Sequence, residues 1–215
     1  MLNHHIYLLR HGDVDLAPDV CYGQLDCNVA DSFDDELLKV KRYLVDNVLP
    51  SGDCQIETMP EFITSPLKRC YQLADGLTSQ LNGKSNLQTY DAFKEINFGS
   101  WEGINWVEIG KNKIDDWNEN FIDFMFPEGE SAGIFHERVM NGWHELLDDL
   151  AKQKQQQTFI IVTHAGVIRS ILSDFLHIPL SHSLSLEINK LSISCLRINS
   201  HQNDLSRCVY INHTI

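Results

Sequence analysis

Histidines and arginines stand at three points where a short apolar run of the sequence stops. These points are Arg10-His11 after residues 5–9, Arg69 after 61–64 and His164 after 159–163. A histidine can act as a nucleophile or carry a proton near neutral pH. An arginine presents a fork of N–H donors that matches the oxygens of a phosphate group. If the fold brings these points together, the pattern favours chemistry on a phosphorylated compound.

Taken singly, each signal has a plainer explanation. Arg10 and His11 could be exposed loop residues, and Arg69 could lie on the surface. His164 could simply cap the helix that follows it. Arg69 is nevertheless out of place in the first turn of a helix, where free N–H groups favour anions. A phosphate held by those N–H groups and a guanidinium together would explain it. Ala165, with its small side chain, leaves similar room for an anion at the other helix start.

A candidate acid, Glu95, lies in an aromatic segment that runs from Phe93 to Gly103. A carboxyl group among aromatic side chains is partly desolvated, which favours its protonated form. That form is what a general acid needs. On this segment alone, a solvated loop glutamate is an equally good explanation.

Apolar periodicity predicts the elements that must position these residues. Strands are expected at 5–9, 61–64, 87–91 and 159–163, and near the end of the chain around 184–188, 191–198 and 207–212. Helices are expected over 31–48 before Pro50, from Ser65-Pro66 through Leu77 and Leu81, from a Ser131 cap through Phe135 to Leu150, and over 167–176, with a loop at 152–157. Alternating strands and helices predict an α/β fold in three layers, with helices on both faces of a mostly parallel central sheet. Ligands of such sheets bind at the carboxyl ends of the strands.

The region 99–126 differs in character from the rest of the chain. It holds six aromatic residues separated by polar ones, namely Trp101, Trp106, Trp117, Phe121, Phe124 and Phe126. It has no strand signal, so we expect a small, irregular helical insertion. The whole chain, residues 1–215, is then expected to be a single domain that carries this insertion.

The composition limits the partners that the protein can take. A chain of 215 residues with 43% hydrophobic residues can bury a sizeable core. Its formal net charge of −13 argues against non-specific nucleic-acid binding, which needs a basic face. No apolar run is long enough to span a bilayer or to form a signal peptide. The six cysteines show no C-x-x-C spacing and are expected to be free and mostly buried in a cytoplasmic protein.

Together these residues resemble the motifs of the histidine phosphatase superfamily, also called the phosphoglycerate-mutase-like family. Five segments match its motifs in the correct order: LLRHG, SPLKRCYQLA, EINFGSWEG, PEGES and VTHAGVIRS. The resemblance covers nearly the whole chain. It implies that His11 is the nucleophile, that Arg10 and Arg69 clamp the phosphate, and that a protonated His164 also contacts it. Glu95 would protonate the leaving oxygen, and no metal or other cofactor would be needed.

One departure from the family pattern affects the phosphate pocket. After RHG the family often reads Glu-Thr and places an asparagine soon afterwards, whereas this chain reads Asp13-Val14-Asp15-Leu16. The segment 22–26, Tyr-Gly-Gln-Leu-Asp, fits a subgroup with a Y-G-x-x-D loop. We expect Gln24 or a backbone amide to replace the missing contact. The expected substrate-binding residues are therefore Tyr22, Gly23, Gln24 and Ala165.

Within the family, the size, the Y-G-x-x-D loop and the compact insertion are most like alpha-ribazole phosphatases of bacterial cobalamin synthesis. That likeness implies alpha-ribazole 5′-phosphate or adenosylcobalamin 5′-phosphate as the substrate, with Trp101 and Trp106 nearest in sequence to Glu95. Most rings of the insertion are expected to pack its own core. The alternatives are a phosphatase of a sugar phosphate or phosphoserine, a mutase, an inactive protein that binds a phosphorylated ligand, and a metal-dependent hydrolase.

Overall fold

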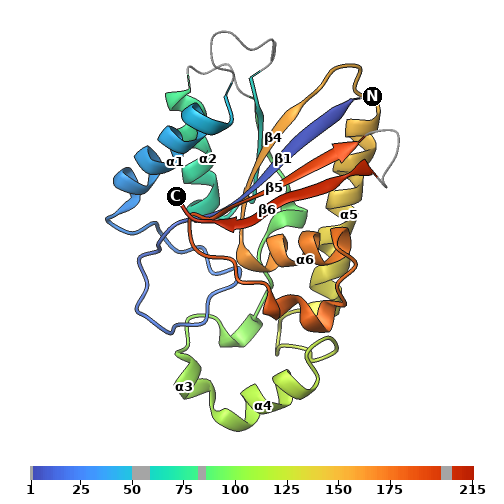
Figure 1. Ribbon diagram of the computed structural model, residues 1–215. Helices are drawn as coiled ribbons and strands as arrows, with labels where there is room; N and C mark the ends of the chain where they lie inside the picture. Colours follow the sequence, from blue (N-terminus) through green and yellow to red (C-terminus); the bar gives the residue numbers. More distant parts are fainter. Residues whose placement is uncertain (1, 50–58, 82–85, 200–204) are drawn as a thin grey trace.

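The computed structural model describes residues 2–49, 59–81, 86–199 and 205–215 (Figure 1). Its centre is a six-stranded sheet with the order β3-β2-β4-β1-β5-β6. The strands are β1 (Asn3–Arg10), β2 (Glu61–Thr64), β3 (Leu87–Thr89), β4 (Thr158–Thr163), β5 (Ile193–Asn199) and β6 (Arg207–His213). The first four run parallel to one another, and β5 and β6 add an antiparallel edge. The expected α/β class with a mostly parallel sheet is confirmed.

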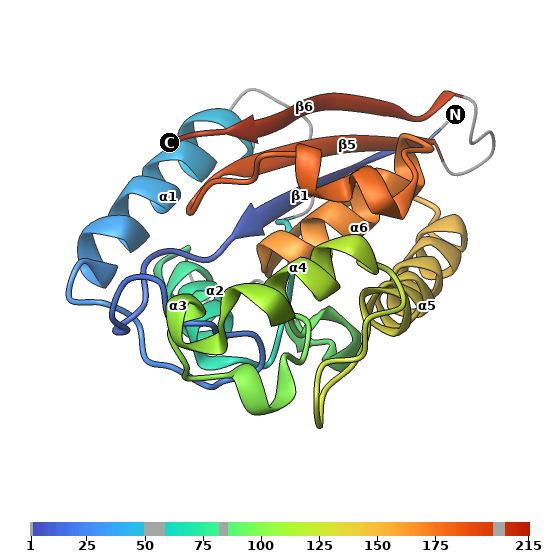
Figure 2. The same ribbon diagram turned by 90° about the horizontal axis from the view of Figure 1, so that it is seen from below.

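Helices cover both faces of the sheet, as expected (Figures 1 and 2). The long helices are α1 (Phe33–Asn47), α2 (Lys68–Gln80), α5 (Ala132–Ala151) and α6 (Ala165–Phe175). Helices α1 and α2 pack on one face, and α5 and α6 pack on the other. Ser131 caps α5 by accepting a hydrogen bond from the backbone N–H of Ile134. Among the described residues, no helix is both long and apolar enough to cross a membrane.

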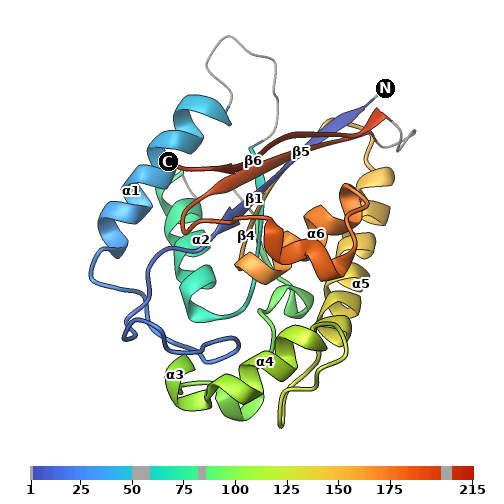
Figure 3. The same cartoon turned by 60° about the horizontal axis from the view of Figure 1, so that its bottom comes forward.

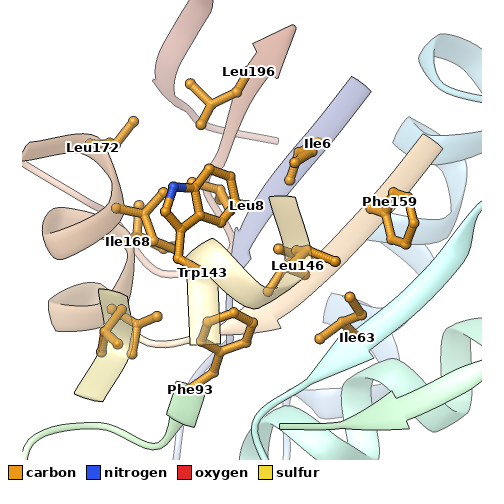
Figure 4. Packing of buried hydrophobic residues seen from close by; sticks show 14 of the residues in the cluster. Ile6, Leu8, Ile63, Phe93, Trp143, Leu146, Phe159, Ile168, Leu172 and Leu196 are labelled. Atoms are coloured by element: carbon orange, nitrogen blue, oxygen red, sulfur yellow. The ribbon is translucent and has the colours of Figure 1, made fainter. Parts of the chain in front are cut away.

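The alternation of side chains along β1 divides the core into two clusters. Ile6 and Leu8 point toward α5 and α6, where Trp143 lies in the cluster shown in Figure 4. Tyr7 and Leu9 point toward α1 and α2 on the opposite face. Every residue of β4 is buried, which is typical of a central parallel strand covered on both sides.

The expected helical insertion lies below the sheet and beside the segment that follows β1 (Figure 3). It contains a 3-10 helix at Gly99–Trp101, the short helix α3 (Trp106–Ile109) and α4 (Lys111–Glu119). A small core of its own is formed by Cys21, Trp101, Ile109 and Phe126. Because Cys21 comes from the segment after β1, the insertion is tied to the loop that follows the RHG motif.

The expected strand around 184–188 is wrong. A 3-10 helix covers Leu180–Ser185, and the chain then turns without joining the sheet. The carbonyl groups of Leu186 and Ile188 accept hydrogen bonds from Arg169 and Arg10, so they are not available to a strand ladder. Helix α2 begins at Lys68, later than the Ser65-Pro66 start suggested by the sequence. Pro50 lies outside the described residues.

Cysteines Cys21, Cys27, Cys70 and Cys195 are buried and free, and Cys208 is free and half-buried. The prediction of free, mostly buried cysteines is confirmed for these five, while Cys54 lies outside the described residues.

Candidate active site

Backbone pairing places the carboxyl ends of strands β1, β2 and β4 next to one another. Arg10, the last residue of β1, pairs with Thr163, the last residue of β4. The pairing continues one residue further, because the backbone N–H of His11 donates to the Thr163 carbonyl at 3.0 Å. On the other side of β4, the N–H of Ser65 donates to the Val162 carbonyl, also at 3.0 Å. The loop starts after β1, β2 and β4 therefore meet at one edge of the sheet, as the sequence predicts.

His11 is buried and held in one tautomer. Its Nδ1 atom lies 2.8 Å from the carbonyl oxygen of Gly12. Since a carbonyl only accepts, Nδ1 carries the ring hydrogen and Nε2 carries the lone pair. Burial lowers the pKa of His11 well below its ordinary value, and the charges of Arg69 and Arg10 lower it further. The imidazole is therefore neutral and its Nε2 atom is available as a nucleophile.

Arg69 has nearly all of its N–H groups engaged. Nε donates to Nε2 of His11 at 3.3 Å, and NH2 donates to the Gly23 carbonyl at 2.6 Å. NH1 donates to the Leu25 carbonyl at 2.9 Å and contacts the Cys27 sulfur at 3.6 Å. A guanidinium has five N–H donors, so one hydrogen on NH2 remains for a ligand. Arg69 thus holds the 22–27 loop and contacts His11 at the same time.

Arg10 is anchored through one end of its guanidinium. NH1 donates to the Ile188 carbonyl at 2.6 Å. Its Nε is buried and has no hydrogen-bond partner among the described residues. A buried N–H without a partner is costly, and a bound phosphate oxygen would satisfy it.

His164 is fully buried, and its side chain does not cap α6. Nε2 lies 2.8 Å from the hydroxyl of Ser65, and the ring centroid lies 5.2 Å from that of His11. Burial, followed by the charge of Arg69, lowers the pKa of His164 well below its ordinary value. Burial and the arginine charges therefore favour the neutral imidazole, and a protonated His164 in contact with a phosphoryl group stays a prediction.

Glu95 is half-buried on a segment without regular secondary structure. Its Oε2 accepts from the backbone N–H of Gly166 at 3.1 Å, and Oε1 accepts from that of Ile96 at 3.2 Å. Gly166 is required for this approach, since a Cβ atom there would lie 2.2 Å from Oε1 of Glu95. The start of α6 therefore holds the candidate acid, whereas the sequence suggested that it leaves room for an anion.

A cavity of about 160 Å³ brings the candidate residues together. It is lined by Arg10, His11, Val20, Tyr22, Arg69, Glu95 and Trp106. Both histidines of the site are neutral, so the two guanidinium groups outweigh the single carboxyl group. The cavity therefore has a cationic wall around the lone pair of His11, which we name the cationic pocket.

A second cavity of about 180 Å³ shares Tyr22 and Glu95 with the cationic pocket. Most of its other lining residues are apolar, including Ile96, Phe98, Trp117, Phe121, Phe135 and Leu184. Arg169 also lines it, with Nε bonded to the Leu186 carbonyl at 2.8 Å. We name this space the apolar pocket.

The expected substrate-binding residues fall in different places. Tyr22 lines both pockets, while Gly23 turns its carbonyl toward Arg69. The side-chain amide of Gln24 donates to the Glu95 carbonyl at 3.1 Å, and Gln24 lines neither pocket. Its role as a replacement phosphate contact stays a prediction. Ala165 is buried and is not among the residues that line either pocket. Val20 borders the cationic pocket near the segment whose usual hydroxyl and amide are missing.

Sequence reasoning missed two residues around the site, Ser65 and Glu102. Ser65 follows β2 as His11 follows β1 and His164 follows β4, and that parallel was a usable signal. Glu102, in the third motif, accepts from the backbone N–H groups of Gln24 and Phe98 and so joins the 22–27 loop to the insertion. Its presence in the EINFGSWEG motif was the signal in the sequence that could have identified it.

The fold and the site define an α/β protein with a cationic pocket at the carboxyl ends of its parallel strands. A sequence model of the histidine phosphatase superfamily (branch 1) matches residues 6–210, a range that includes every residue lining the two pockets. The chain belongs to the histidine phosphatase superfamily.

Three relatives illustrate how far the similarity reaches. The chain is 26% identical to phosphoserine phosphatase 1 of Hydrogenobacter thermophilus over 152 residues, which is 68% of each protein. Its structure is similar to that of the alpha-ribazole phosphatase from Shigella flexneri, with a TM-score of 0.80, 18% identity and coverage of 97% of this chain and 96% of that one. It is also similar to a mycobacterial glucosyl-3-phosphoglycerate phosphatase, with a TM-score of 0.79, 19% identity and coverage of 99% and 100%. These two structural matches show a shared fold.

Proposed function

We propose that this protein hydrolyses phosphomonoesters through a phosphohistidine intermediate on His11. The observation that carries the proposal is the hydrogen bond from Nδ1 of His11 to the Gly12 carbonyl. It leaves the Nε2 lone pair directed away from that carbonyl, and Arg10 and Arg69 line the same cationic pocket. A neutral nucleophile beside fixed cations suits phosphoryl transfer, in which positioning and electrostatics supply most of the acceleration.

The reaction divides into two displacements. In the first, the Nε2 lone pair of His11 forms a bond to phosphorus while the bond from phosphorus to the ester oxygen breaks. Glu95 gives its proton to that oxygen, and an alcohol leaves. In the second, Glu95 takes a proton from water as the water oxygen attacks phosphorus. The nitrogen–phosphorus bond then breaks, and inorganic phosphate and neutral His11 are restored.

Trapping the intermediate tests this proposal. Enzyme quenched during turnover of a ³²P-labelled ester should carry acid-labile label, and His11→Ala should carry none and have no activity. Label on a different residue would overturn the assignment of His11. Release of inorganic phosphate separates a hydrolase from a mutase, and any turnover excludes an inactive binding protein. Because the proposed cations are side chains, activity should survive exhaustive chelation.

For the substrate, we propose alpha-ribazole 5′-phosphate or the 5′-phosphate of adenosylcobalamin. The apolar pocket supports this proposal, because it is lined in part by Glu95, the residue proposed to protonate the leaving oxygen. Trp117 and Phe121 line it and offer faces for a flat base. Trp101 does not, since it is buried against Phe126 with ring centroids 5.0 Å apart. A stacked base gains about 1–3 kcal/mol, which corresponds to about tenfold or more in affinity.

Arg169 favours a second candidate, a phosphorylated hydroxy acid such as phosphoserine. Arg169 lines the apolar pocket, and a carboxylate on the leaving group could pair with its guanidinium. The relative named phosphoserine phosphatase 1 is consistent with such a substrate. Neutral alpha-ribazole would make no use of this charge.

Values of kcat/KM for a panel of phosphate esters distinguish the two candidate substrates. If alpha-ribazole is the natural leaving group, its ester should exceed phosphoserine, 3-phosphoglycerate and fructose 2,6-bisphosphate, and Trp117→Ala should lower that preference. If a hydroxy acid is natural, phosphoserine should exceed phosphoethanolamine, which lacks the carboxylate, and Arg169→Gln should abolish the difference. A better rate on any of the three competitors would end the cobalamin assignment and leave the phosphohistidine mechanism standing.

A further inference from the structure

Glu95 depends on its surroundings for its position. The segment on which it lies runs between the 3-10 helices Asp91–Phe93 and Gly99–Trp101 and has no regular hydrogen-bond ladder of its own. A side chain on such a segment is placed by whatever holds the nearby backbone. In this protein, Arg138 of helix α5 makes several of the hydrogen bonds that hold this backbone.

The guanidinium of Arg138 binds three backbone carbonyl groups around Glu95. NH1 donates to the Ala92 carbonyl at 2.9 Å and to the Lys94 carbonyl at 3.0 Å. NH2 donates to the carbonyl of Glu95 itself at 3.2 Å. The planar fork of an arginine is suited to several acceptors fixed in one plane, and a lysine cannot reproduce it.

Glu130, just before the cap of α5, completes this arrangement. Its Oε1 lies 2.6 Å from NH2 of Arg138, and its Oε2 lies 3.4 Å from Nε. Oε1 also accepts from the backbone N–H of Asn97 at 2.9 Å. The side chains of Arg138 and Glu130 are only 26% and 13% exposed. Together, Arg138 and Glu130 therefore hold three carbonyl groups from Ala92 to Glu95 and the backbone N–H group of Asn97.

We propose that Arg138, supported by Glu130, is a positioning residue that sets the carboxyl group of Glu95 against the leaving oxygen. The proposal rests on the acid role of Glu95 in the proposed function. Arg138 does not line either of the two pockets, so it acts through Glu95 and not on the substrate. Misplacement of a reacting group by about 1 Å can cost about 10²-fold in rate. Loss of the clamp should therefore affect mainly the step that needs the acid.

The test is a double-mutant cycle with Arg138→Met, Glu95→Gln and their combination. The rate of the first step is measured by rapid quench on β-glycerophosphate, whose leaving group needs a proton, and on p-nitrophenyl phosphate, whose leaving group needs little help. Arg138→Met should slow β-glycerophosphate by about 10-fold to 10²-fold and p-nitrophenyl phosphate much less. In the Glu95→Gln background it should cause almost no further loss, because the group that it positions is already gone.

Two further variants keep the result interpretable. Arg138→Lys keeps the charge near His164 but loses the fork, so it should resemble Arg138→Met; it also carries the test if Arg138→Met does not fold. Arg42→Met, at an exposed arginine of α1, is the matched control and should behave as wild type.

A purely structural role predicts a different pattern. Two results would overturn the positioning proposal, provided that Glu95→Gln alone still slows β-glycerophosphate more than p-nitrophenyl phosphate. One is that Arg138→Met slows the first step equally on both substrates. The other is that its effect on the rate adds to that of Glu95→Gln. If Glu95→Gln shows no such dependence, the acid role fails first and the positioning proposal falls with it.

Discussion

Nε of Arg69 lies 3.3 Å from Nε2 of His11 and donates a hydrogen bond to the lone pair that, in the proposed function, attacks phosphorus. This hydrogen bond engages the lone pair of His11. A phosphoryl group that enters the cationic pocket has to take over this hydrogen bond through one of its oxygens. The exchange couples binding of the anion to release of the nucleophile, because one N–H group serves both partners in turn.

Arg69→Ala should therefore weaken binding of vanadate and phosphate, because it removes one cation and its N–H donors from the pocket. Hydrogen bonds to charged groups contribute about 1.5–3 kcal/mol each, so inhibition by vanadate should weaken by about tenfold or more. Competitive inhibition constants measure this effect, with Arg42→Ala as the control. Unchanged inhibition would show that Arg69 only holds the 22–27 loop.

Glu95→Gln should slow hydrolysis of alkyl phosphates by about 10²–10⁴-fold, the usual contribution of general acid–base catalysis. An aryl phosphate with a good leaving group should form the phosphoenzyme at nearly the wild-type rate and then accumulate it, because the second step also uses Glu95. Rapid-quench measurement of both steps checks this. Equal slowing of phosphoenzyme formation on alkyl and aryl esters would contradict the acid role.

Gly166→Ala should reduce activity and leave the fold nearly as stable as in the wild type. The added Cβ would lie 2.2 Å from Oε1 of Glu95, the movable end of a side chain, so the carboxyl group gives way. Alkyl phosphates should again be affected more than aryl phosphates. Gly133→Ala, where the nearest atom would be 3.3 Å away at the Ile122 carbonyl, is the control. A large drop in Tm with Gly166→Ala would mean that the backbone moved instead.

Acid should destabilise the unliganded protein through its buried neutral histidines. The pKa values of His11 and His164 are lowered in the folded state, first by burial. Below their unfolded pKa, about 6.5, the unfolded chain binds more protons than the folded one, so stability falls as pH falls. Each histidine contributes a slope of up to about 1.4 kcal/mol per pH unit.

Unfolding by urea between pH 7 and pH 5 measures this slope. The double variant His11→Asn/His164→Asn should show a shallower dependence on pH, and His182→Asn, at an exposed position, should not change it. Saturating vanadate should also flatten the slope, because a bound anion favours protonated histidine. A slope that is the same in wild type and double variant would assign the effect to other groups.

The sequence predicted the parts of the site that local pattern controls. His11, Arg69 and His164 follow strong strand signals, and parallel strands bring their carboxyl ends to one edge, so their convergence followed from the order of elements. The lowered pKa of His164 could not be predicted in the same way, because it depends on complete burial and on the nearby guanidinium groups of Arg69 and Arg10.

The contacts that support the site could not be predicted from local sequence patterns. Arg138 binds carbonyl groups more than forty positions away in the chain, and any residue type presents the same carbonyl group. Gln24 was expected in the phosphate pocket from the Y-G-x-x-D motif, yet its amide turned to the Glu95 carbonyl. The run at 184–188 had a strand pattern, but its neighbouring carbonyl groups were used by Arg10 and Arg169.

The central place of β1 in the sheet has a consequence for synthesis of the protein. His5 pairs with Thr158 on one side and with Arg197 on the other, so the strand that leads to His11 has no neighbours until more than 150 further residues have been made. On the ribosome, the first strand to emerge must wait for β4 and β5, whose pairing closes the longest loops of the chain and is intrinsically slow. A nascent chain that ends before β4 therefore has His11 but no pocket around it, and the proposed phosphoryl transfer requires nearly the whole chain to have been synthesised.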